Sequence, residues 1–116
     1  MMSIELKISP IFTEVREIRE GSPYKICNLQ LKGSGWLPAL PARVWQNIFT
    51  TDAERRYLAL VAWDIDKENN PGFNIFVIDA EEKTVNESPR YCGCCSSLAW
   101  SAIGVSFTTN GFYICP

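Results

Sequence analysis

Two apolar segments that flank a short acidic loop constrain the fold of this chain more than any other feature. Residues 57–63 read YLALVAW and residues 73–78 read FNIFVI. Because successive side chains of a strand point to opposite faces, each segment would place apolar side chains on both faces. A strand of this kind must be covered on both sides. The pattern therefore predicts two interior strands of a packed β-sheet.

The segments around this pair predict further strands. Cys27, Leu29 and Leu31 alternate with polar residues, which is typical of a strand with one face in water. Asn110-Gly111 is the preferred pair for a two-residue hairpin turn, so it predicts a final hairpin in which Thr109 pairs with Phe112. Residues 91–97 are small and predict a loop. The expected strands are residues 4–8, 24–32, 44–49, 84–87 and 98–106.

One segment, residues 10–20, predicts a short helix. Ile11, Val15 and Ile18 have helical spacing, Pro10 would stand at the first helical position, and Gly21 would end the helix. A charged strand is the alternative, because strands are expected on both sides. The fold class is thus mainly β, an antiparallel meander or sandwich with at most one or two short helices.

The length of the chain indicates a single domain over residues 1–116, because 116 residues are enough to bury a sizeable core. The longest uninterrupted apolar run, residues 57–63, is far shorter than the ~20 residues of a membrane-spanning helix, so no membrane partner is expected. The first ten residues, MMSIELKISP, have neither the basic start nor the apolar centre of a secretion signal. We therefore expect a cytoplasmic protein.

The chain contains no histidine, which excludes catalytic sites that depend on a histidine base and metal sites that depend on histidine ligands. No stretch matches a catalytic or cofactor motif, so we expect neither an enzyme nor a cofactor. The five cysteines are an odd number, which favours free thiols. Cys92, Cys94 and Cys95 offer thiolates for zinc, although their spacing is not that of the usual paired-cysteine site.

Charge is distributed unevenly along the chain. Residues 64–87 carry seven acidic and two basic side chains, whereas residues 91–116 carry no charge. An acidic chain without a basic stripe is not expected to bind nucleic acid. An uncharged tail of this length predicts core, or a surface that another protein covers. The candidate contact residues are Asp64, Asp66, Glu68, Glu81 and Glu82, with Trp36, Trp45 and Tyr91 as aromatic anchors.

A small, acidic, single domain without catalytic motifs resembles the bacterial immunity proteins that neutralise toxin domains. The resemblance is one of overall profile, and it implies a protein partner such as a nuclease-type toxin domain. The five carboxylates would steer the encounter and the aromatic rings beside them would supply affinity. We expect a monomer or a weak dimer.

The sequence is also compatible with two other functions. A carbohydrate or small-ligand binding module would use Trp36, Trp45 and Tyr91. A zinc-stabilised or thiol-redox protein would use Cys92, Cys94 and Cys95.

Overall fold

The computed structural model describes residues 8–110 of the chain. These residues form nine β-strands and no helix, so the expectation of a mainly β, antiparallel fold is confirmed. None of them belongs to a helix that is long and apolar enough to cross a membrane. The strands are β1 (Ser9–Glu17), β2 (Lys25–Lys32), β3 (Trp45–Thr51), β4 (Tyr57–Trp63), β5 (Gly72–Asp79), β6 (Thr84–Glu87), β7 (Tyr91–Cys92), β8 (Cys94–Ser101) and β9 (Gly104–Asn110).

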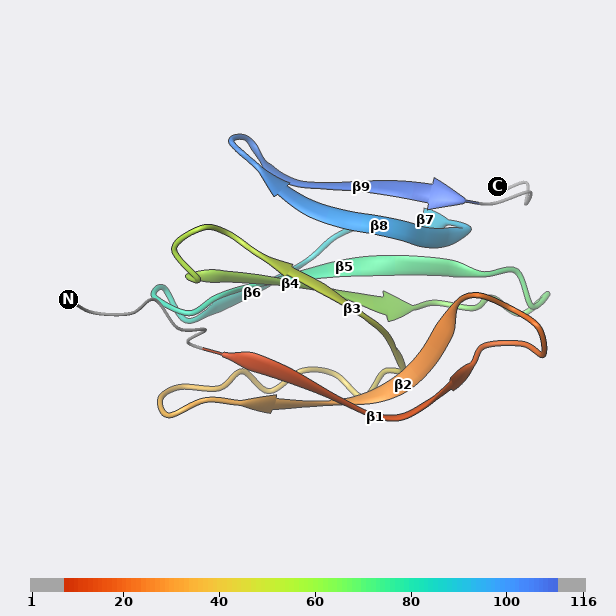
Figure 1. The fold of residues 1–116 in the computed structure, drawn as a ribbon, viewed down its shortest axis with the longest axis horizontal. Helices are drawn as coiled ribbons and strands as arrows, with labels where there is room; N and C mark the ends of the chain where they lie inside the picture. The colour runs from red at the N-terminus through yellow and green to blue at the C-terminus, as the bar shows by residue number, and fades with distance from the viewer. Residues whose placement is uncertain (1–7, 111–116) are drawn as a thin grey trace.

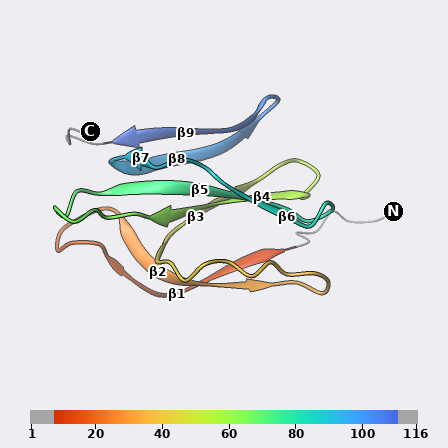
Figure 2. The same cartoon turned by 180° about the vertical axis from the view of Figure 1, so that it is seen from behind.

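The strands form a curled sheet and a separate hairpin. The sheet has the order β1-β2-β3-β4-β5-β6, with β7 paired to β5, and every pairing is antiparallel. The hairpin consists of β8 and β9. Figure 1, and Figure 2 from behind, show β1 and β2 on one side of the central strands and the β8–β9 hairpin on the other. The central strands therefore lie between two layers.

Strand β4 is interior, as its sequence predicts. It pairs with β3 on one side and with β5 on the other. Every residue from Leu58 to Trp63 is at most 3% exposed. A strand that is apolar on both faces is stable here because each face has its own apolar layer to contact. The two layers make two separate cores.

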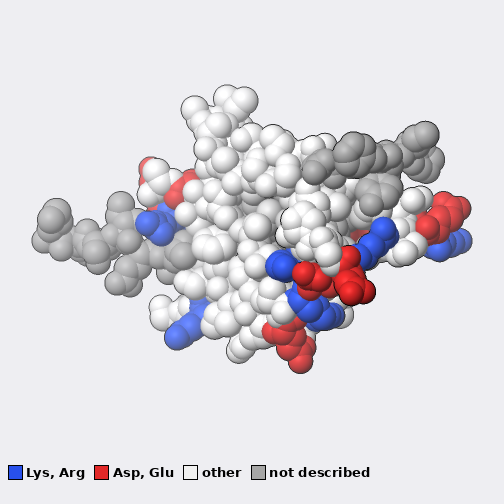
Figure 3. Space-filling view, turned by 45° about the vertical axis from the view of Figure 1, so that its right-hand side comes forward, with Lys and Arg blue, Asp and Glu red and all other residues white. Residues whose placement is uncertain are grey.

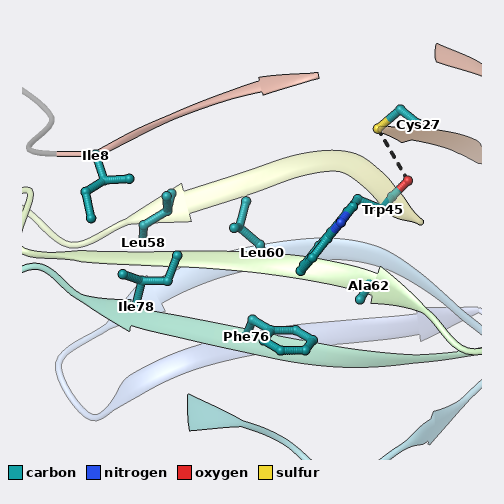
Figure 4. Packing of buried hydrophobic residues seen from close by; sticks show 8 residues of the cluster. All are labelled: Ile8, Cys27, Trp45, Leu58, Leu60, Ala62, Phe76 and Ile78. Carbon is teal, nitrogen blue, oxygen red and sulfur yellow. Dashed lines mark hydrogen bonds between the residues drawn. The ribbon is translucent and has the colours of Figure 1, made fainter. Parts of the chain in front are cut away.

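The first core lies between the central strands and the β1–β2 side of the molecule (Figure 4). The rings of Trp45 and Phe76 meet edge to face, with centroids 5.1 Å apart, and the Cys27 thiol donates a hydrogen bond to the Trp45 carbonyl at 3.3 Å. Partly buried side chains of β1, β2 and the connection to β3 close this core from outside. Its buried members are Ile8, Cys27, Trp45, Leu58, Leu60, Ala62, Phe76 and Ile78.

The second core lies under the β8–β9 hairpin. Phe73 contacts Phe107 of β9 edge to face at 5.7 Å and the ring of Tyr91 at 5.6 Å. Val105 and Phe107 are alternate residues of β9, and both pack against this core. Its buried members are Ala59, Val61, Phe73, Ile75 and Cys95.

The prediction of a helix over residues 10–20 is wrong. This segment is strand β1, which pairs with β2 from Ser9 opposite Lys32 to Glu17 opposite Lys25. The apolar stripe that suggested a helix is not a buried face, since Ile11 and Val15 are 38% and 45% exposed. Pairing with β2 satisfies most of the backbone of β1, apart from an irregularity between Thr13 and Arg16, and it outweighs the weak local preference for a helix.

The carboxyl-terminal part of the sequence also differs from expectation. Residues 91–97 do not form a loop, because they contain β7 and the start of β8. The strand expected over residues 98–106 is divided by a turn at Ala102 and Ile103. Ser101 and Gly104 stand at the first and fourth positions of this turn, where serine and glycine are preferred, and Gly104 has a φ of 125°. The expected strand over residues 4–8, except Ile8, and the turn at Asn110-Gly111 with its partner strand lie outside the described residues.

Replacing Leu60 by alanine tests the burial of β4. Leu60 is fully buried, so we expect L60A to lower the free energy of unfolding by about 2–5 kcal/mol, as measured by urea denaturation. Ile103 is 98% exposed, and I103A should change that free energy by less than about 0.5 kcal/mol. Equal effects of the two substitutions would contradict the observed burial.

Candidate functional site

The five candidate carboxylates do not form one surface. Tyr57 lies opposite Asp79 and Trp63 lies opposite Phe73, so β4 and β5 form a hairpin whose loop is residues 64–71. Asp64, Asp66 and Glu68 are in that loop, whereas Glu81 and Glu82 follow the far end of β5. The two groups are separated by the length of the strands, ~20 Å at ~3.3 Å per residue. The prediction of a single acidic region is therefore corrected to two regions.

The first group mostly organises its own loop. The Asp66 carboxylate accepts hydrogen bonds from the backbone N–H groups of Asn70 at 2.8 Å and Glu68 at 3.0 Å. The hydrogen bonds from Asn70 and Glu68 hold the pKa of Asp66 below its ordinary value. Asp64 forms an ion pair with Arg90 at 3.7 Å. These two carboxylates therefore have internal partners.

Basic side chains lie beside this loop as well. Arg19, from the connection between β1 and β2, donates a hydrogen bond to the Asn69 carbonyl. Figure 3 shows acidic and basic side chains together on the lower right of the molecule. Electrostatic steering by a purely negative surface is not available on a face where both signs are mixed.

The second group surrounds Arg56, a residue that the sequence alone did not single out. Its guanidinium donates two hydrogen bonds to the Asp79 carboxylate, at 2.9 and 2.8 Å. It also lies 3.1 Å from Glu81 and 3.9 Å from Glu82. The hydrogen bonds between Arg56 and Asp79 hold the pKa of Asp79 well below its usual range. The same hydrogen bonds raise the pKa of Arg56. The only sequence feature that could have indicated this ion pair is that charged residues stand at the end of β5 and just before β4.

The three candidate aromatic residues do not share a surface either. Trp45 is 3% exposed and belongs to the first core, so it cannot anchor a partner at the surface. Trp36 packs partly buried against the same core. Tyr91 packs against the second core, with its ring 4.6 Å from that of Phe107. A carbohydrate platform built from all three rings is therefore not assembled.

The cysteines are placed for packing. Cys94 and Cys95 are free and buried, as is Cys27. Burial raises the pKa of the Cys95 and Cys27 thiols to about 11, so both are protonated at neutral pH and are poor thiolate donors. Cys92 is disulfide-bonded, so the expectation of a free thiol is wrong at this position. An odd number of cysteines leaves one unpaired but does not forbid a disulfide.

Metal ligands do not gather in the described part of the chain. Within residues 8–110, no three histidine, cysteine, aspartate or glutamate side chains are placed to hold a metal ion. Neighbouring Cys94 and Cys95 lie on one strand, where successive side chains point to opposite faces. The thiolates of the zinc hypothesis are therefore directed apart.

The β8–β9 layer is an uncharged part of the described surface. No residue of β8 or β9 is charged, and the upper part of the molecule in Figure 3, where these strands lie, carries no charge colour. Its outer face carries hydroxyl groups, with Ser96 and Ser97 both hydrogen-bonded to Thr108 at 2.7 and 2.6 Å. Within residues 8–110, β9 pairs with β8 alone.

A groove of about 240 Å³ runs beneath β9, where the second core is open at its side. Its floor is formed by Ile75 and Val77 of β5 and its wall by Val105 and Phe107 of β9. Val77 is only partly buried, whereas the other residues of β5 are buried. The remaining lining residues are Asn86, Glu87, Ser88 and Tyr91.

No protein-family model matches this chain, and comparisons with curated proteins and with solved structures found no similar protein.

The pairing of Arg56 with Asp79 makes stability depend on pH. The pKa of Asp79 in the folded protein lies below its value of about 3.9 in an unfolded chain, so the carboxylate stabilises the fold above about pH 4 and this contribution is lost as the pH falls. We expect D79N to lower the melting temperature by several degrees at pH 7, with a smaller difference at about pH 2.

The control for this prediction is E82Q, because Glu82 is exposed and lies 3.9 Å from Arg56. It should leave the melting temperature nearly unchanged at both pH values. A D79N effect that is the same at pH 7 and pH 2 would show that the charge of Asp79 is not what stabilises this end of the sheet.

Proposed function

We propose that this chain is an inhibitor of the immunity type, which binds a protein partner such as a toxin domain through the edge of β9 and the groove beneath it. The observation that supports the proposal is an uncharged strand beside an open apolar groove, with one edge that no other strand within residues 8–110 pairs with. This moves the expected contact surface away from the acidic loops, where Asp64, Asp66, Glu81 and Glu82 all have partners within the chain.

The edge of β9 lacks the features that usually keep strand edges apart. Proteins protect such edges with charged side chains, with proline or with short strands. Strand β9 has seven residues, GVSFTTN, and none of them is charged or a proline. An exposed edge of this kind is a template for pairing with another chain.

The groove supplies apolar contact beside that edge. Val77 and Phe107 are partly buried by the second core but still line an open space. Covering them with a partner would remove apolar surface from water, which is the main favourable contribution in protein association. The carboxylates would affect the rate of encounter and its dependence on salt more than the affinity.

The test compares the same substitution on two faces of the sheet. Val77 lines the groove, whereas Val85 lies opposite Ile78 and therefore on the face of the first core, where it is 36% exposed. We expect V77K to weaken binding of the toxin at least tenfold by placing an unpaired ammonium in the interface, and V85K to change binding less than twofold.

The partner for this measurement is obtained by affinity purification from the native host with the wild-type chain. Binding is then measured by calorimetry, and neutralisation by the activity of the purified toxin. Recovery of no protein whose activity the chain inhibits would reject the immunity function. Equal binding by V77K and V85K would reject the groove as its site.

We propose that this action takes place in the cytoplasm. The disulfide at Cys92 is unusual for that compartment, where disulfides are rare, so the location needs a direct test. Recovery of the chain in the cytoplasmic fraction of the host cell would support it, and recovery only outside that fraction would contradict it.

A further inference from the structure

A second cavity, of about 450 Å³, lies on the side of the first core, away from the β9 groove. It is bounded by β2, by β3 and by the connection between them, residues 33–44. Most of its side chains are apolar. They include Leu29, Leu31, Leu37, Leu40, Ala42 and Trp45.

The cavity exists because β2 and β3 separate after a single pair of residues. Cys27 lies opposite Trp45, and this is the one pair that joins the two strands. The next residues of β3 pair with β4, as Phe49 does with Leu60. Residues 28–32 of β2 therefore have β1 on one side and, within the described chain, no strand on the other. Figure 4 shows Cys27 and Trp45 at the point where the strands meet.

The register with β1 shows which backbone groups of β2 face the cavity. Pro10 lies opposite Leu31 and has no N–H, so this pair is one that exchanges no hydrogen bonds. Antiparallel pairs alternate, so Gln30 bonds to β1 whereas Leu29 and Leu31 direct their N–H and C=O groups to the other edge. Leu29 and Leu31 are also the residues of β2 with apolar side chains that line the cavity.

The opposite wall of the cavity, formed by the connection between β2 and β3, also has main-chain groups without backbone partners in the described chain. Residues 33–43 form no strand, and their backbone makes no hydrogen bond to the backbone of any described residue. Pro38 and Pro41 keep this wall extended. Arg43 has its guanidinium bonded to the Trp63 carbonyl and to Asn74, so no free cation is available to hold an anionic ligand.

We propose that this cavity binds an extended, uncharged peptide segment, which pairs with the free edge of β2 as an added strand. A peptide backbone presents alternating donors and acceptors that can pair with the N–H and C=O groups of Leu29 and Leu31, and its alternate small apolar side chains would lie against the leucines that line the cavity. The volume is within the range of sites that hold ligands of this size. This site is independent of the β9 groove and of the proposed immunity function.

The premise that Leu29 and Leu31 lie on an unpaired edge of β2 can be tested on the free protein. Hydrogen exchange should be fast for the amides of Leu29 and Leu31 and slow for that of Gln30, because only the last is bonded to β1. Slow exchange at Leu29 and Leu31 in the free protein would show that the edge is already paired, and would overturn the proposal.

The binding test uses the capped, uncharged peptide Ac-Ser-Val-Thr-Val-Ser-NH₂ as probe. Titration into the isotope-labelled chain should shift the amide signals of Leu29 and Leu31 and slow their exchange. The same peptide with both valine nitrogens methylated keeps the side chains but loses two donors, so it should bind at least tenfold more weakly. No shift at millimolar probe, or equal binding of the two peptides, would overturn the proposal.

Two matched variants locate the site. Ala39 and Ala42 are both exposed residues of the connection, but only Ala42 lines the cavity. We expect A42F to fill the space and weaken probe binding at least tenfold, and A39F to change it less than twofold. Probe binding that A42F leaves unchanged, or that shifts the amides of Val105 and Phe107 instead, would refute this location.

Discussion

The structure depends on the complete burial of β4. Leu58, Leu60 and Ala62 belong to one core and Ala59 and Val61 to the other, so a single strand contributes to both. Because its two faces must both be covered, the chain has to supply a layer on each side. The β1–β2 side and the β8–β9 hairpin are these layers, and the two cavities occur where each layer ends before the central sheet does.

Charged groups mostly stabilise the ends of this arrangement. Asp66 caps the loop at one end of the β4–β5 hairpin, and the pair of Arg56 and Asp79 closes the other end. The hairpin thus has a polar cluster at each end and an apolar middle. An acidic composition, which suggested a negative binding surface, here largely reflects internal hydrogen bonding and ion pairing.

The open edges of the sheet connect this architecture to function. Strand β9 carries no charge, and only β8 pairs with it within residues 8–110. Strand β2 is separated from β3 beyond Cys27. Among the described residues, both strands therefore leave main-chain groups beside apolar side chains. Such places favour recognition of polypeptide over recognition of small polar molecules, because they combine backbone hydrogen bonding with apolar contact. The proposed protein partner and the proposed peptide site follow from the same physical feature at two positions.

The sequence by itself determined that the chain is β-rich and which strands are interior, because the apolar side chains on both faces of residues 57–63 and 73–78 are a local property that each segment carries alone. It also located β2, β3 and β6. It could not decide between strand and helix for residues 10–20, since that choice depended on pairing with β2. It could not show that Trp45 is buried, that Arg56 meets Asp79, or that the carboxylates lie at opposite ends of a hairpin. Those facts are set by register and layering between residues distant in the chain, and only the tertiary structure decided them.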